Sequence, residues 1–141
     1  MRYGVVTAAF CVAAVLAAVS GCGRQGRDLT ATGQVVVEPV ASETVRWAWA
    51  EVWQEGEEVV VEGRLARRGC SSCPVLGHVD VTILDADGKV IRQASSPVMG
   101  IRRSTPGTGL KLTPFALRMK LTPPADARAV LAYHGGGHEG P

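Results

Sequence analysis

Several stretches between residues 34 and 134 alternate apolar and polar residues with a period of two. In GHVDVTIL, Val79, Val81 and Ile83 alternate with His78, Asp80, Thr82 and Leu84, of which the first three are polar. Successive side chains of a β-strand point to opposite faces of a sheet, so this pattern predicts a strand with one buried face. Residues 115–121 alternate in the same way, with two basic residues among the polar positions. Both stretches are therefore expected to cover a core.

Other runs rich in valine and aromatic residues are bounded by glycine, proline and acidic residues. Valine and tryptophan favour strands, so we interpret residues 44–53 as a strand, although their length would also suit a helix. The tetrapeptide DADG at residues 85–88 supplies the glycine that a tight hairpin turn needs. Three prolines interrupt residues 95–114, where we expect a loop with a short strand inside. The expected strands are residues 34–40, 44–53, 59–68, 78–84, 89–94, 115–121 and 127–134.

About seven short strands with regularly spaced turn signals predict an all-β fold, an antiparallel β-sandwich. The pattern across residues 34–134 resembles that of fibronectin type III and immunoglobulin-like domains. The resemblance implies a module for binding or assembly, but a fold does not by itself determine a function.

The chain begins with a basic residue, Arg2, followed by an uncharged apolar run over residues 5–19. This run is shorter than the roughly 20 residues that a membrane-spanning helix needs, and it ends in small residues, as secretory signals do. The segment Val19-Ser20-Gly21-Cys22 resembles the lipobox of bacterial lipoproteins, in which an aliphatic residue, a small residue and Gly or Ala precede a cysteine.

The resemblance implies that residues 1–21 form a helical signal peptide, cleaved before Cys22. The Cys22 thiol would carry a diacylglycerol and its amine a further acyl chain, and two or three chains anchor a protein stably. An ordinary secretory signal and an uncleaved anchor are the alternatives. By analogy with enteric bacteria, Gly23 in place of an aspartate favours the outer membrane, facing the periplasm. Apart from this covalent lipid we expect no cofactor.

Removing residues 1–21, which hold one of the 15 basic and none of the 13 acidic residues, leaves 120 residues with a net charge of +1. This length suits one domain, expected over residues 34–134. We expect residues 22–33 to be a lipidated, flexible tether and residues 135–141 a flexible tail rich in Gly and His. The nearly balanced charge argues against nucleic acid as a partner.

Cys70 and Cys73 remain in the mature chain, spaced C-x-x-C, and the spacing allows three interpretations. A local disulfide suits an oxidising compartment. Thiol exchange is disfavoured because Pro74 and an expected strand follow, without the helix of a thioredoxin-like site. A metal site needs two ligands beyond the two thiolates, and the chain has no second C-x-x-C pair.

Three histidines, His78, His134 and His138, are the available further ligands, and with the cysteine pair they suit Cu or Zn. His78 and His134 could approach one another if their strands end at the same pole. The alternative is that His134 and His138 belong to a solvated terminus.

All three tryptophans, Trp47, Trp49 and Trp53, lie in one expected strand, and in a regular strand they share one face. They either build the core of a domain with few other aromatic residues or form an exposed strip that stacks on glycan. In the second case Ala48, Ala50 and Val52 would pack inward.

No Ser-His-Asp order, paired-carboxylate pattern or glycine-rich phosphate loop is evident, so we do not expect an enzyme. The sequence favours a non-catalytic, lipid-anchored envelope protein that binds a partner protein or an envelope polymer such as glycan. The alternative is a periplasmic metal-handling lipoprotein that uses Cys70, Cys73 and the histidines.

Overall fold

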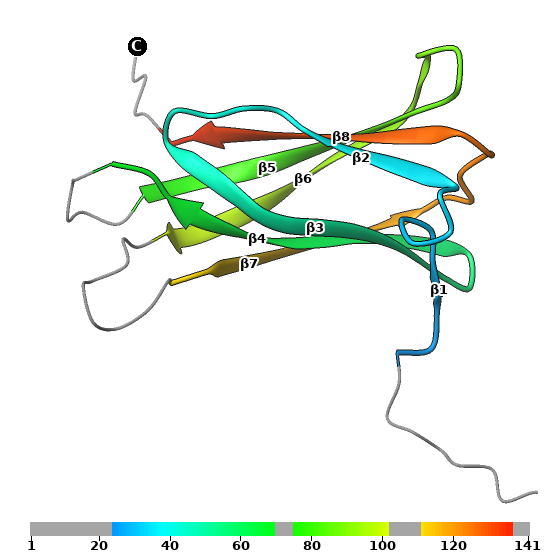
Figure 1. The fold of residues 1–141 in the computed structure, drawn as a ribbon, viewed down its shortest axis with the longest axis horizontal. Helices are drawn as coiled ribbons and strands as arrows, with labels where there is room; N and C mark the ends of the chain where they lie inside the picture. The colour runs from blue at the N-terminus through cyan, green and yellow to red at the C-terminus, as the bar shows by residue number, and fades with distance from the viewer. Residues whose placement is uncertain (1–23, 70–74, 102–110, 137–141) are drawn as a thin grey trace, which may run out of the picture.

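The computed structural model describes residues 24–69, 75–101 and 111–136. Within these ranges the chain forms eight strands and no helix. The strands are β1 (Arg27–Asp28), β2 (Val35–Pro39), β3 (Val45–Glu55), β4 (Glu58–Arg67), β5 (Val75–Leu84), β6 (Val90–Ile101), β7 (Thr113–Lys120) and β8 (Ala127–Gly135). One sheet has the order β1-β3-β4-β7 and the other the order β2-β8-β5-β6, as Figure 1 shows.

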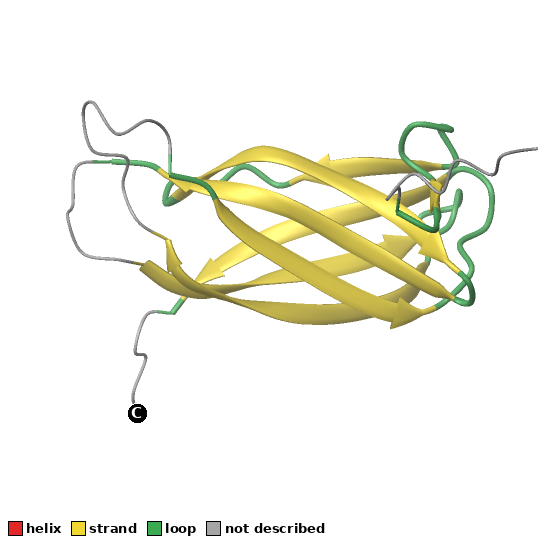
Figure 2. Ribbon diagram, turned by 90° about the horizontal axis from the view of Figure 1, so that it is seen from below, coloured by secondary structure: helices red, strands yellow, loops and turns green. Residues whose placement is uncertain are grey.

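The two sheets lie face to face, and side chains from both form one core (Figure 2). Val79, Val81 and Ile83 are fully buried, as their alternation predicted, and residues 115–121 likewise turn Phe115 and Met119 inward. This two-layered all-β arrangement is compatible with the expected β-sandwich. The main core side chains are Leu29, Val35, Val45, Val52, Val59, Val61, Leu65, Val79, Val81, Ile83, Val98, Ile101, Phe115, Met119 and Leu131.

The predicted turn at residues 85–88 is confirmed and joins β5 to β6. Gly88 has a φ of 83°, a left-handed conformation that side chains disfavour. The Asp85 carboxylate accepts hydrogen bonds from the backbone N–H groups of Asp87 (3.0 Å) and Lys89 (2.9 Å). The turn therefore closes through its own aspartate as well as through its glycine.

The second strand of this hairpin is longer than the sequence predicted. We expected residues 95–114 to be mostly loop, but β6 continues through Pro97 to Ile101. Among the strands that the structure describes it is an edge strand, with β5 as its one neighbour. Proline is tolerated there because a strand edge can leave one side without a ladder hydrogen bond.

One strand pair corrects the expectation of a wholly antiparallel sandwich. β2 pairs with β8 in parallel, from Val35 opposite Ala127 to Pro39 opposite Leu131. The other pairs are antiparallel. A tight hairpin enforces antiparallel pairing, whereas β2 and β8 are joined through nearly the whole domain, so no short turn dictates their direction.

The segment expected to be a tether, residues 22–33, belongs to the domain over its described part. Arg27 and Asp28 pair with β3, and Leu29 is fully buried. The Asp28 carboxylate accepts the N–H of Ala31 at 2.8 Å, and Gly33 completes the turn with a φ of 73°. Backbone hydrogen bonds hold the segment beside this buried side chain, since Leu29 donates its N–H to the Val52 carbonyl at 2.9 Å and accepts the N–H of Val35 at 3.1 Å.

Removing the Leu29 side chain tests whether residues 24–33 belong to the folded domain. Leu29→Ala should lower the free energy of unfolding by about 2–5 kcal/mol, the cost of emptying a buried leucine site. Leu76 is 50% exposed. Leu76→Ala is therefore the matched control and should cost about 1 kcal/mol or less. Urea denaturation measures both variants, and equal small effects would show that residues 24–33 do not contribute to the folded domain.

Candidate functional site

The expected lipidation site, Cys22, lies outside the described residues, and Arg24 is the first residue that the structure describes. The Arg24 guanidinium lies 4.7 Å from the centre of the Trp53 ring, a cation–π distance. Arg24 Nε is 2.6 Å from a carboxylate oxygen of Glu55, and Nη1 forms an ion pair with Glu62. We call Arg24, Trp53, Glu55 and Glu62 the Arg24 cluster.

Glu55 receives a second cation from β7, since Arg118 Nη1 lies 2.8 Å from its other carboxylate oxygen. Hydrogen bonds from Arg24 and then from Arg118 hold the pKa of Glu55 below its ordinary value of 4.5. The Arg24 cluster together with Arg118 thus joins the N-terminal segment to three strands of one sheet by charge-assisted hydrogen bonds.

The lowered pKa of Glu55 gives a pH dependence with a definite sign. A carboxyl that ionises more readily in the folded protein adds stability above pH 4.5, and this stability is lost as the pH falls through the folded-state pKa. Glu55→Gln should therefore flatten the acid side of the stability profile, measured by urea denaturation from pH 7 down to pH 3. Glu57→Gln, at a largely exposed neighbour, is the control and should keep the wild-type profile.

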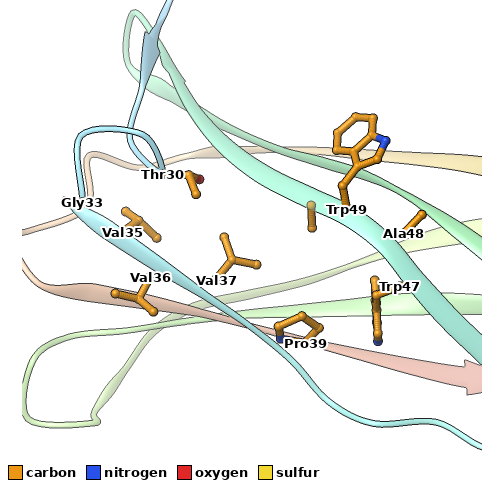
Figure 3. Close-up of a pocket in the computed structure, with 10 residues that line it drawn as sticks. Thr30, Gly33, Val35, Val36, Val37, Pro39, Trp47, Ala48 and Trp49 are labelled. Carbon is orange, nitrogen blue, oxygen red and sulfur yellow. The ribbon is translucent and has the colours of Figure 1, made fainter.

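The tryptophans do not share one face, which corrects the sequence expectation. The register of β3 against β4 shifts between Trp47 and Trp49, which places a β-bulge at Ala48. A bulge adds one residue to a strand and so reverses the alternation of side chains beyond it. Trp47 turns inward and meets Phe115 edge to face at 5.8 Å, whereas Trp49 points to the other side of β3 (Figure 3).

Trp53 lies on the same side as Trp49, but the Arg24 guanidinium covers its ring. Trp49 is 42% exposed and is the tryptophan that remains open to solvent. The three tryptophans therefore form neither a shared core nor an exposed strip. The Trp47 ring belongs to the core, the Trp53 ring to the Arg24 cluster and the Trp49 ring to the surface.

A groove of about 460 Å³ lies between β2 and β3, where the edges of the two sheets meet (Figure 3). Its side chains are apolar except for that of Thr30. We call this the β2–β3 groove. Its lining is Thr30, Gly33, Val35, Val36, Val37, Pro39, Trp47, Ala48, Trp49 and Ala50.

Hydrogen bonds fix the groove at both ends. At one end the Thr30 hydroxyl accepts the N–H of Val52 at 2.8 Å, and at the other Trp47 Nε1 donates to the carbonyl of Val40 at 2.9 Å. β1 pairs with Trp53 and Gln54 of β3, and the Val52 carbonyl accepts the N–H of Leu29 at 2.9 Å, so within the described ranges the edge of β3 lacks a strand partner only before Val52. The groove therefore presents apolar side chains beside an open strand edge.

Trp49 also borders a second hollow, of about 380 Å³, over β4 and β7. Its lining includes Pro114 and Ala116 as well as two charged residues, Glu62 and Arg64. Trp49 therefore separates an apolar groove from a hollow that has charged side chains.

The structure brings His78 and His134 together, as the sequence analysis allowed. They are opposite one another on β5 and β8, with ring centres 5.2 Å apart. Asp80 joins them, since its two oxygens lie 3.5 Å from His78 Nε2 and 3.3 Å from His134 Nε2, and the Ser95 hydroxyl donates to it. In the part of the chain that the structure describes, no three His, Cys, Asp or Glu side chains are arranged to hold a metal ion.

The remaining expected ligands, Cys70, Cys73 and His138, lie outside the described residues, so their pairing stays a prediction. Comparisons with protein-family models, curated proteins and solved structures found no match to this chain. No helix long and apolar enough to cross a membrane occurs over residues 24–69, 75–101 and 111–136.

Proposed function

We propose that this chain is a non-catalytic, lipid-anchored protein of the bacterial cell envelope, held by lipid on Cys22 in the outer membrane and facing the periplasm. It binds a partner protein or an envelope polymer at the β2–β3 groove. The observation that carries the proposal is the exposed ring of Trp49 between two concave surfaces. The lipobox at residues 19–22 supports the location.

The chemistry of the groove favours an extended partner. Exposed apolar side chains gather there, with Val36 at 52% and Trp49 at 42% exposure, and such patches mark interaction sites. A strand edge without a partner offers backbone hydrogen bonds to an added strand, while apolar hollows beside it take alternate side chains. An indole ring also stacks on sugar rings, so the hollow with Glu62 and Arg64 would suit a glycan.

We keep the fibronectin type III or immunoglobulin-like type as part of this proposal. Two packed four-stranded sheets support it. The strand order departs from that of constant-type immunoglobulin domains, in which the last strand lies at a sheet edge, because β8 is internal and the N-terminal β2 occupies the edge beside it.

Photo-crosslinking in living cells tests the site and distinguishes protein from glycan. With p-benzoylphenylalanine in place of Ala48, irradiation should give an adduct, whose mass and protease sensitivity identify the partner. Trp49→Ala should reduce the yield about tenfold, the effect of losing about 1.4 kcal/mol at a hot spot. The same probe in place of Met99, which is 71% exposed on β6, is the control and should give no adduct. Equal adducts from both positions would contradict a site at the groove.

The pairing of His78 with His134 favours a second candidate function, metal handling. Two imidazoles are good ligands for Cu and Zn, and a carboxylate beside them orients the rings. The further ligands would be Cys70, Cys73 and His138. This candidate requires reduced cysteines, because a disulfide withdraws the two thiolates.

Native mass spectrometry of the chain with added zinc or copper tests the second candidate. Metal handling requires one bound ion per chain, which His134→Ala and Cys70→Ser each abolish. A mass about two daltons below the reduced chain without a metal adduct would show a closed Cys70–Cys73 bridge and would count against this function.

A further inference from the structure

The N-terminal segment is bound to the domain from Arg24 onward. The Arg24 cluster fixes its first side chain, and β1 adds backbone pairing to β3. At Gly26 the backbone packs closely against β3, since an added Cβ would be 3.0 Å from the carbonyl oxygen of Gln54. Buried Leu29 completes the attachment.

One residue, Gly23, separates Arg24 from Cys22. Two Cα–Cα steps span at most about 7.6 Å. If residues 23–33 were a flexible tether, their ends would be about 18 Å apart on average and would move freely. The attachment therefore removes nearly all of the free chain between the expected lipid and the folded domain.

We propose that the anchored domain lies directly against the membrane, with the end that holds β1 facing the lipid. This inference rests on the proposed lipidation of Cys22. In Figure 1, β1 lies at one pole and β8 ends at the opposite pole. His134 is the next-to-last residue of β8 and His78 is opposite it, so this pair belongs to the pole away from the membrane.

The membrane-facing pole includes the β3–β4 turn and the end of β7. Leu121 donates its N–H to the carbonyl of Glu57 at 3.0 Å, which holds these two segments together. Their exposed charges are of both signs, since Lys120 Nζ lies 3.6 Å from Glu57 and Arg118 contacts Glu55. The contact therefore does not depend on anionic lipid, and zwitterionic vesicles are the appropriate probe.

The β2–β3 groove is lined by residues of β2 and β3, which run between the two poles in Figure 1. A domain without a flexible tether cannot extend far into the periplasm. The partner must therefore come to the surface of the same membrane, or be attached to it, in order to reach Trp49.

Limited proteolysis tests the attachment. The lipidated protein is placed in phosphatidylcholine vesicles, treated with trypsin, and analysed by mass spectrometry for cuts after Arg24 and Arg27 only. Wild type should resist these cuts, and the double variant Glu55→Gln/Glu62→Gln should be cut at least tenfold faster. The control Glu38→Gln/Glu57→Gln removes two other surface carboxylates that face basic residues and should behave as wild type. Equally fast cutting of the wild type and the Glu55/Glu62 variant would overturn the proposal.

Tryptophan quenching by spin-labelled lipid headgroups tests proximity. Trp53 is close to the membrane-facing pole, so wild type should be quenched. About ten Gly/Ser residues inserted between Gly23 and Arg24 would let the domain move about 17 Å away and should abolish the quenching. Quenching that is unchanged by the insertion, or absent in both proteins, would overturn the proposed contact.

The mass of the Cys22 peptide is measured separately, because it shows whether the cysteine is acylated. An unacylated cysteine would overturn the proposed anchor and this inference with it, whereas an acylated cysteine with fast cutting or no quenching would overturn the inference alone.

Discussion

The β-bulge at Ala48 determines how the two ends of β3 are used. Before it, Trp47 faces the core and packs on Phe115, and beyond it Val52 faces the core while Trp53 faces outward. In a strand of strict period two, residues 47 and 52 would lie on opposite faces, so either the indole or the valine would leave the core. The extra residue lets both remain inside, and it places Trp49 at the surface between the groove and the hollow.

Gly63 on the neighbouring strand β4 is needed for the same bulge. It lies opposite Ala50 and Phe115, where an added Cβ would be 2.7 Å from the Phe115 ring and 3.0 Å from the Ala50 Cα. The carbonyl of Trp49 also approaches this point. The bulge and the aromatic pair therefore use the space that the missing side chain leaves, and tight packing of this kind tolerates little added volume.

The sequence predicted the elements whose signals are local. Alternation at Val79, Val81 and Ile83 and the turn glycine Gly88 are such signals, and the structure confirms them. The sequence did not predict the elements that depend on a partner far away in the chain. Leu29 is one apolar residue among polar ones, so only the neighbouring β3 shows that its segment is part of the core. The bulge has no signature either, because alanine is an ordinary strand residue.

Some residues of the candidate sites were also predictable from local sequence signals, and others were not. The tryptophans were found by residue type, but their separation into core, cluster and surface depends on the bulge and on Arg24. The sequence left the approach of His78 and His134 as a possibility, which the antiparallel pairing of β5 with β8 realises, whereas Asp80 had no signal beyond alternation. Arg24 was missed because a basic residue in a polar, glycine-containing segment is typical of a tether, and its partners Glu55 and Glu62 are 31 and 38 residues away in the chain.

The segment from Arg24 to Pro39 connects the expected anchor with the candidate site. It passes from the Arg24 cluster through β1 into β2, which forms one wall of the β2–β3 groove. The other wall, β3, carries Trp53 and Glu55 of the same cluster. Both walls are therefore fixed to one another next to the expected lipid, and Trp47 and Val40 join them again at the far end. A groove held at both ends loses little conformational freedom when it is filled, which leaves more of the contact energy for affinity. The proposed attachment at the membrane and the preformed groove thus depend on the same few contacts of the N-terminal segment.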